Sequence, residues 1–167
     1  MSTKVPVKEL TTTALLGSIL ALLGTFKIPG IIPGTEFQLS APFAVCIAAS
    51  LGFRRYLGIG ILASCINLLM GTHTILNVTV AMVFRIVVGL IITVIGVNPI
   101  SLLISGPLGT IAGRIVLGGI LHTDYKVLIL GAVPGMIFTA VVAGLFYPVF
   151  QRILRHTNYK LECKDKV

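Results

Sequence analysis

The stretch NVTVAMVFRIVVGLIITVIG, residues 77–96, decides the class of fold. Its length matches the roughly 20 residues that an α-helix needs to cross the hydrocarbon core of a bilayer. Arg85 is the one charged residue in it. A guanidinium does not lose its proton in proteins, so its charge is expensive to place in lipid. The stretch therefore predicts a membrane-spanning helix in which Arg85 has a polar environment of its own.

The composition of the whole chain supports a membrane protein. Of its 167 residues, 56% are hydrophobic and 11% are charged, and the mean hydropathy is +1.04. A water-soluble domain of this size exposes too much of its chain to hide so much apolar surface. The length predicts a single domain over residues 1–167. The net charge of +8 does not indicate nucleic-acid binding, because the cations gather at the two ends and at one turn.

The apolar segments and the breaks between them predict six transmembrane helices in an all-α bundle. The expected helices cover about 7–26, 39–53, 57–70, 77–96, 100–121 and 127–154. The second and third are short for a bilayer, so a re-entrant hairpin is the alternative for them. Two separate spans are favoured, because a hairpin would place Arg54 and Arg55 near the bilayer centre.

The distribution of cations predicts that both termini are cytoplasmic. In that orientation only Lys27 and Lys126 lie outside, and the two remaining cations, Arg85 and Arg114, lie inside spans. The cytoplasmic side then carries nine cations: Lys4, Lys8, Arg54, Arg55, Arg152, Arg155, Lys160, Lys164 and Lys166. The expected location is the cytoplasmic membrane of a prokaryotic cell, with several crossings.

Arg85 and Arg114 are the first candidates for a binding site. At 1.5 Å per residue, Arg85 lies roughly 12 Å and Arg114 roughly 10 Å below the outer ends of their helices. The two arginines are therefore expected at similar depth, with no acidic residue in the spans near them. Each either bonds to helix carbonyls and snorkels outward, or lines a water-accessible outer cavity and binds a polar or anionic ligand. The shared depth favours the cavity.

Other candidates for ligand contact lie at the same end of the predicted bundle. Asn67 is an amide inside an apolar segment, and His73 and Asn77 belong to the next loop and helix start. The loop KIPGIIPGTEFQ, residues 27–38, combines rigid prolines, flexible glycines and apolar side chains. It is either a plain connector or a lid over the cavity, in which Glu36 and Phe37 contact the ligand.

Small residues recur at spacings of three and four along the first predicted helix. They include Ala14, Gly17, Ser18 and Ala21. Such a stripe lets another helix approach closely in a membrane. The partner is either a neighbour in the same bundle or a separate membrane subunit.

The sequence contains no recognisable catalytic, metal or nucleotide site. The segment GPLGTIAGR lacks the Lys-Ser/Thr pair of a phosphate-binding loop, and there is no HExxH motif. The predicted spans hold no Asp or Glu pair for metal or proton chemistry. We therefore expect no enzymatic activity, no metal and no cofactor.

Taken together, these features resemble the substrate-binding (S) components of energy-coupling factor (ECF) vitamin transporters. The resemblance covers nearly the whole chain, and GTHTILNVTVAMVFRIVVGL, residues 71–90, looks like the loop-to-fourth-helix region of members that take up vitamin precursors. It implies capture of a vitamin from outside and docking through Ala14 and Ser18, with Gly17 and Ala21 on the same face. The partners would be a transmembrane coupling subunit and two ATP-hydrolysing subunits.

The residues leave several substrates and two alternative functions open. Two arginines without a counter-acid favour a ligand with a carboxylate, a phosphate or several acceptors. The resemblance leaves open α-ribazole, a thiamine precursor, pantothenate or another vitamin acid, and the first two are the leading expectation. The alternatives are a self-contained secondary carrier or channel, which normally shows a coupling residue or internal repeat, and an assembly protein without a cavity.

Overall fold

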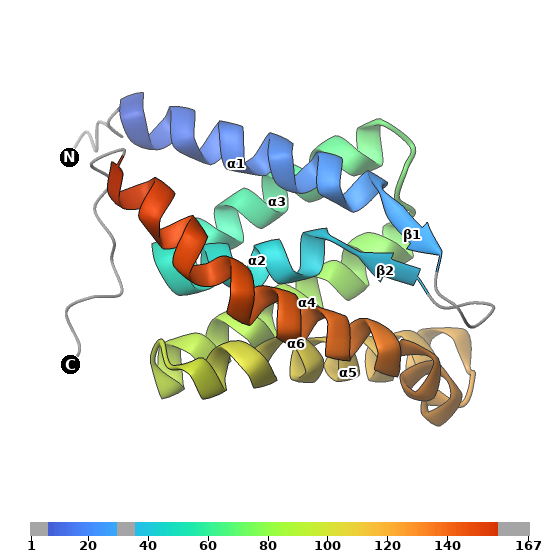
Figure 1. The fold of residues 1–167 in the computed structure, drawn as a ribbon. Coiled ribbons are helices and arrows are strands. Elements are labelled where there is room, and N and C mark those ends of the chain that lie inside the picture. The colour runs from blue at the N-terminus through green and yellow to red at the C-terminus, as the bar shows by residue number, and fades with distance from the viewer. Residues whose placement is uncertain (1–6, 30–35, 157–167) are drawn as a thin grey trace.

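The computed structural model describes residues 7–29 and 36–156, which form six helices and a two-stranded ribbon (Figure 1). The predicted all-α bundle is confirmed. In chain order the elements are α1 (Val7–Thr25), β1 (Lys27–Pro29), β2 (Glu36–Gln38), α2 (Ser40–Leu51), α3 (Phe53–Leu69), α4 (Ile75–Ile95), α5 (Pro99–Leu121) and α6 (Tyr125–His156).

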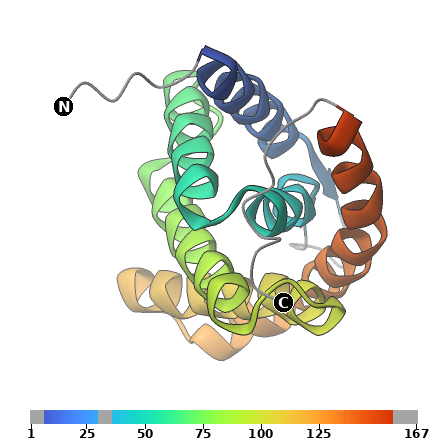
Figure 2. The ribbon, with the colours of Figure 1, turned by 90° about the vertical axis from the view of Figure 1, so that its left-hand side faces the viewer.

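The helix α2 lies at the centre of the bundle and contacts all five other helices (Figure 2). Nine of its 12 residues are buried. At 1.5 Å per residue it is about 18 Å long, which is too short to cross a hydrocarbon core of about 30 Å. Its small alanines let the surrounding helices approach closely, and the ring of Phe43 packs edge-on against Phe150 of α6 at 5.3 Å. The second predicted span is therefore an internal helix rather than a lipid-facing one.

The surrounding helices expose apolar side chains on the outside of the bundle. Leu69 is 88% exposed, Val94 80% and Leu130 74%. Contiguous exposed apolar surface of this kind is stable only when lipid or protein covers it. The helices α4 and α5, together with residues 125–154 of α6, are long and apolar enough to cross a membrane. This outside surface is the one expected of a membrane-embedded bundle.

Local signals in the sequence explain where the helices begin and end. Gly52 has φ 78° between α2 and α3, a conformation that glycine adopts without a steric penalty. The break therefore comes earlier than predicted, and Arg54 and Arg55 belong to the first turn of α3. The hydroxyl of Thr74 accepts from the Asn77 backbone N–H at 3.4 Å, which caps the start of α4.

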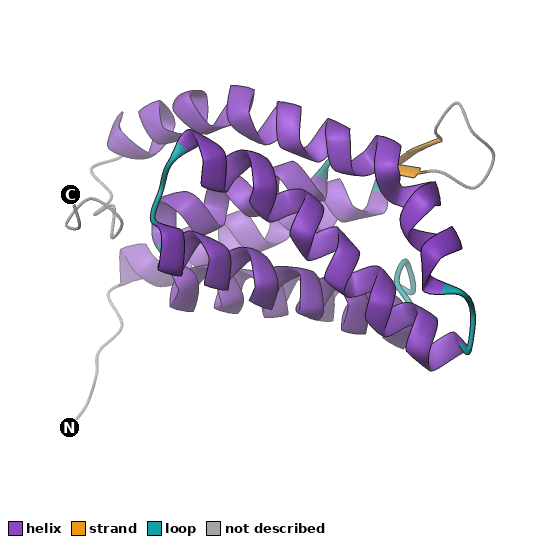
Figure 3. Ribbon diagram, turned by 90° about the horizontal axis from the view of Figure 1, so that it is seen from below, coloured by secondary structure: helices purple, strands orange, loops and turns teal. Residues whose placement is uncertain are grey.

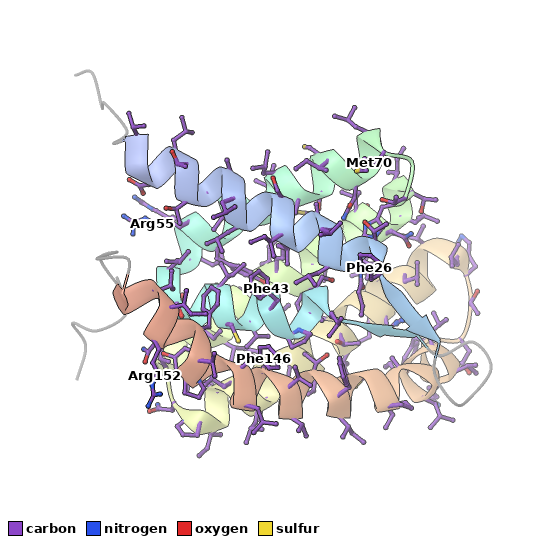
Figure 4. All side chains as sticks on the ribbon, turned by 45° about the horizontal axis from the view of Figure 1, so that its top comes forward. Phe26, Phe43, Arg55, Met70, Phe146 and Arg152 are labelled. Carbon is purple, nitrogen blue, oxygen red and sulfur yellow. The ribbon has the colours of Figure 1, made fainter. Side chains whose placement is uncertain are left out.

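The two ends of the bundle differ in charge. The β1–β2 ribbon extends from one end, which we call the hairpin end (Figure 3). Arg55 and Arg152 both lie at the opposite end of the bundle, where α1 begins and α6 ends (Figure 4). Arg55 Nε donates to Glu9 Oε1 at 2.7 Å and ties the start of α3 to the start of α1. The assignment of this end to the cytoplasm stays a prediction from the cation count.

The small residues of α1 divide between two faces. Gly17 and Ala21 are buried inside the bundle, and a Cβ at Gly17 would lie 2.7 Å from Leu62 of α3. Ala14 and Ser18 are exposed, and the Ser18 hydroxyl donates to the Ala14 carbonyl at 2.9 Å. The expectation that all four share a docking face is wrong for Gly17 and Ala21, because both are buried inside the bundle. The exposed pair stays a prediction.

Candidate functional site

A cavity of about 240 Å³ lies at the hairpin end, between the ends of the surrounding helices and the first turn of α2. Every helix except α6 contributes to it, as does β2. Its polar and charged lining residues are Gln38, Ser40, Asn67, His73, Asn77, Arg85, Thr110 and Arg114. Its apolar lining residues are Leu20, Gly24, Ala41, Ala44, Val80, Ala81, Phe84, Gly109 and Leu117. The cavity thus combines two arginines with other polar groups and an apolar wall.

Arg85 reaches the cavity from the middle of α4 and is only 8% exposed. Its Nη1 donates to the Ser64 hydroxyl at 2.6 Å and lies 3.5 Å from the Met82 sulfur. Both of these acceptors are uncharged. The guanidinium is therefore held in place without being neutralised. Arg85 does not snorkel to the surface but lines the cavity, and its contact with a ligand there stays a prediction.

One face of α3 is shaped to receive the Arg85 side chain. Gly60 and Ser64 lie four residues apart and so share a face of the helix. A Cβ on Gly60 would lie 2.4 Å from Arg85 Cδ and 2.6 Å from its Nε, so only glycine leaves room there. Tyr56, one turn further along this face, is fully buried, and its hydroxyl has no hydrogen-bond partner among the described residues. The Arg85 side chain thus lies against the face of α3 that carries Gly60 and Ser64.

Arg114 lines the same cavity from α5 and is partly exposed. The antiparallel pairing of α4 and α5 fixes its level: Gly113 lies against Val80, and Gly109 against Phe84. The backbone of Arg114 is therefore about six residues nearer the hairpin end than that of Arg85, which is roughly 9 Å along the helix axis. The expectation of similar depth is wrong, because α5 extends further toward the hairpin end than α4. The two arginines nevertheless share one cavity.

The charge of the cavity is not balanced by acidic residues. None of the described residues that line it is an aspartate or a glutamate. Opposite charges 4 Å apart at an effective dielectric constant of about 20 attract by about 4 kcal/mol. An anionic group would therefore gain substantially from either arginine, and hydrogen-bonded guanidinium–carboxylate pairs are the stronger form of this contact. The site is electrostatically suited to anions.

Polar residues other than the two arginines line the cavity near the ribbon. The Gly24 carbonyl accepts from Gln38 Nε2 at 3.2 Å, and His73 Nε2 lies 3.3 Å from the same oxygen. A Cβ at Gly24 would lie 2.9 Å from the Asn67 amide nitrogen. Asn67 itself is 3% exposed, and its backbone carbonyl accepts from the Thr72 hydroxyl at 3.0 Å. These contacts join α1, the ribbon and the α3–α4 loop around the cavity.

The structure brings together five residues that the sequence analysis proposed for the site: Asn67, His73, Asn77, Arg85 and Arg114. Glu36 and Phe37 lie in β2, but their side chains are outside the described part, so their role in a lid stays a prediction. Gln38, Ser40 and Thr110 also line the cavity and were not predicted from the sequence. A period-two pattern could have indicated Gln38, because Glu36 and Gln38 alternate with Phe37.

The fold defines the class of protein. No protein-family model matches the chain. The structure is similar to the crystal structure of the S-component for biotin from an ECF-type ABC transporter, with a TM-score of 0.68 over 93% of this chain and 95% of that one. The sequences are 15% identical. The chain has the fold of an ECF S-component.

The sequence itself places the chain more narrowly. It is 47% identical over 141 residues to protein BioX of Lysinibacillus sphaericus, which covers 84% of this chain and 83% of that protein. The chain belongs to the BioX family. With its exposed apolar helices and this fold, it is a multi-pass protein of the cell membrane.

Proposed function

We propose that this chain is the substrate-binding component of an ECF-type importer, and that it captures biotin or a related carboxylic acid. The observation that supports this most directly is that Arg85 and Arg114 line one shared cavity with no acid among its described lining residues. The S-component with the similar fold binds biotin, and biotin carries a carboxylate. Neither comparison supports the earlier expectation of α-ribazole or a thiamine precursor, so a carboxylic acid replaces them.

The remaining lining residues suit a small organic acid. Phe84 and Leu117 offer an apolar wall for an aliphatic chain or ring, while Asn67 and Thr110 offer neutral donors and acceptors. Small-molecule sites typically combine such an apolar wall with a few polar groups that fix orientation. Binding energy would come from the carboxylate at an arginine, and specificity from the neutral groups.

We propose that partner subunits supply the energy for transport. The sequence of the chain has no nucleotide-binding loop, which suits a subunit whose partners hydrolyse ATP. We propose that Ala14 and Ser18, exposed on α1, contact a transmembrane coupling subunit that associates with two ATP-binding subunits. The rival function is a self-contained carrier or channel. It would require the purified chain alone to move its substrate across a membrane.

Titration calorimetry on the detergent-purified chain tests the proposal. Without ATP, biotin or a related acid should bind, and Arg85→Ala should weaken binding at least tenfold because it removes a charged contact. The matched control is Arg54→Ala, since Arg54 is an exposed cation at the opposite end. Equal affinity in the Arg85 variant and the wild type would remove Arg85 from the site. Uptake by proteoliposomes that contain this chain alone would favour the carrier instead.

A further inference from the structure

We propose that the start of α2 belongs to the binding site and holds the ligand's carboxylate together with Arg85. The donors are the backbone N–H groups of Ser40 and Ala41 and the Ser40 hydroxyl. This inference rests on the proposed function, because it takes the cavity as the site of a carboxylic acid. It goes further by naming the backbone groups that receive the acid and by placing its charged end against the central helix.

The first turn of α2 has hydrogen-bond donors that the protein itself does not use. The first backbone N–H groups of an α-helix have no partner within the helix, and the side chain of Leu39 at the N-cap accepts no hydrogen bond. Within residues 7–29 and 36–156, nothing accepts from the N–H of Ser40 or Ala41 or from the Ser40 hydroxyl. Both residues line the cavity, so these donors are available to a ligand there.

The dipole of α2 favours an anion at the same place. The helix begins at the hairpin end, next to β2 (Figure 1), so the positive end of its dipole lies at the cavity. Nine of its 12 residues are buried, and buried charges are screened less than exposed ones. The dipole therefore acts on the cavity more strongly than the dipole of a surface helix would.

Two deeply buried side chains independently indicate a ligand in this cavity. Arg85 is 8% and Asn67 3% exposed, and both line the cavity. Arg85 contacts only the neutral partners Ser64 and Met82, and the side-chain nitrogen of Asn67 has no hydrogen-bond partner among the described residues. Buried donors normally have an acceptor, and the carboxylate of a ligand would be an acceptor for both.

The Arg85 guanidinium lies at the level of the first turn of α2. Its partner Ser64 follows the turn at Gly52 by 12 residues, and Ser40 precedes that turn by 12. Because α2 and α3 both extend from this turn toward the hairpin end (Figure 1), the two serines lie about equally far from it, at roughly 18 Å. The hydrogen bond of 2.6 Å to Ser64 holds the guanidinium at this level. A single carboxylate in the cavity can therefore accept from both elements.

The wild-type chain allows a direct test, because Ser40–Ala41 is the only Ser–Ala pair in the sequence. Protein labelled with ¹³C at the serine carbonyls and ¹⁵N at alanine gives one carbonyl-coupled N–H signal in the NMR spectrum, that of Ala41. Biotin and octanoate should both shift this signal downfield, because the N–H gains a hydrogen bond to a carboxylate. The primary amide of biotin should shift it less. The control is Ala49 in the buried part of α2, whose signal the single Ala–Ala pair isolates in the same way, and which should not shift.

A variant at Ser40 gives the second test, by titration calorimetry with the same acids. Ser40→Asp places a carboxylate at the start of α2, where it repels the ligand's anion, so affinity should fall at least tenfold. The Tm should not fall, because an acidic residue in the first turn suits the helix dipole. Ser40→Asn is the matched control, with the same shape and no charge, and its affinity should stay within about threefold of the wild type.

The outcomes separate this inference from the proposed function. An acid that binds without shifting the Ala41 signal, or that shifts Ala41 and Ala49 equally, overturns the role of α2 and leaves the proposed function standing. Wild-type affinity in a folded Ser40→Asp variant does the same. If no acid binds the wild type, the proposed function fails and this inference fails with it. The Ala41 signal is measured on the wild type, so it decides the matter even where a Ser40 variant does not fold.

Discussion

Gly60→Ala should displace the Arg85 guanidinium and weaken ligand binding without touching a charged residue. The added methyl would lie 2.4 Å from Arg85 Cδ, whereas ordinary contacts begin at 3.4 Å, so the side chain must move by about 1 Å. The hydrogen bond of 2.6 Å to Ser64 cannot keep its geometry after that shift. A hydrogen bond of a charged group is worth about 1.5–3 kcal/mol, so we expect affinity to fall about 10- to 150-fold.

The control for this experiment lies two residues earlier on the same helix. Gly58 is exposed and a Cβ there meets nothing within 4 Å. Gly58→Ala should therefore leave ligand affinity unchanged and gain up to about 1 kcal/mol of helix stability. Both variants would be measured by titration calorimetry, with thermal unfolding in detergent as a check on folding. If Gly60→Ala does not fold, Ser64→Ala removes the same hydrogen bond and adds no volume. Wild-type affinity in either folded variant would refute the reasoning.

Three further predictions concern packing, an ion pair and docking. Gly109→Ala should lower the free energy of unfolding by about 1–3 kcal/mol through overpacking, because its Cβ would lie 2.8 Å from a phenylalanine ring carbon of α4. The control is Gly119→Ala, because nothing lies within 4 Å of a Cβ there, and equal Tm values for the two variants would contradict the prediction. Glu9→Gln breaks a partly exposed ion pair with Arg55, so Tm should fall by at most about 4 °C, and a larger drop would show that the pair is essential. Ser18→Leu should abolish uptake in cells while calorimetry shows unchanged ligand affinity, and lost affinity would make this face internal packing.

Much of the fold was predictable from the sequence because helix ends carry local signals. The apolar segment around Arg85 and the breaks on either side of it gave α4 to within two residues. The boundary between α2 and α3 was misplaced, because the prediction used the charges of Arg54 and Arg55. The backbone instead turns at Gly52, whose positive φ overrides the charge pattern.

The central position of α2 was not predictable from hydropathy. A helix surrounded by other helices and a helix surrounded by lipid are equally apolar, because lipid tails and leucine side chains are alike in polarity. The length of α2 was the available signal. Its 12 residues are too few for a span, and they fit an internal helix.

The two arginines of the candidate site could be predicted from the sequence, but their relative positions could not. Arg85 and Arg114 stood out because charge is rare inside spans. Their relative level depends on how far α5 slides past α4, which the close approach at Gly109 and Gly113 determines. Gln38 was missed because its contact with the Gly24 carbonyl arises only when the ribbon folds back on α1.

The enclosure of α2 has a consequence for how the bilayer affects this protein. Lipids of different thickness force a transmembrane helix to tilt or force the bilayer to deform. Such a mismatch acts on the surrounding helices, which face the acyl chains, whereas Ser40, Ala41 and Ala44 reach the cavity from a helix that contacts protein on every side. One wall of the cavity is therefore shielded from the lipid composition of the cell.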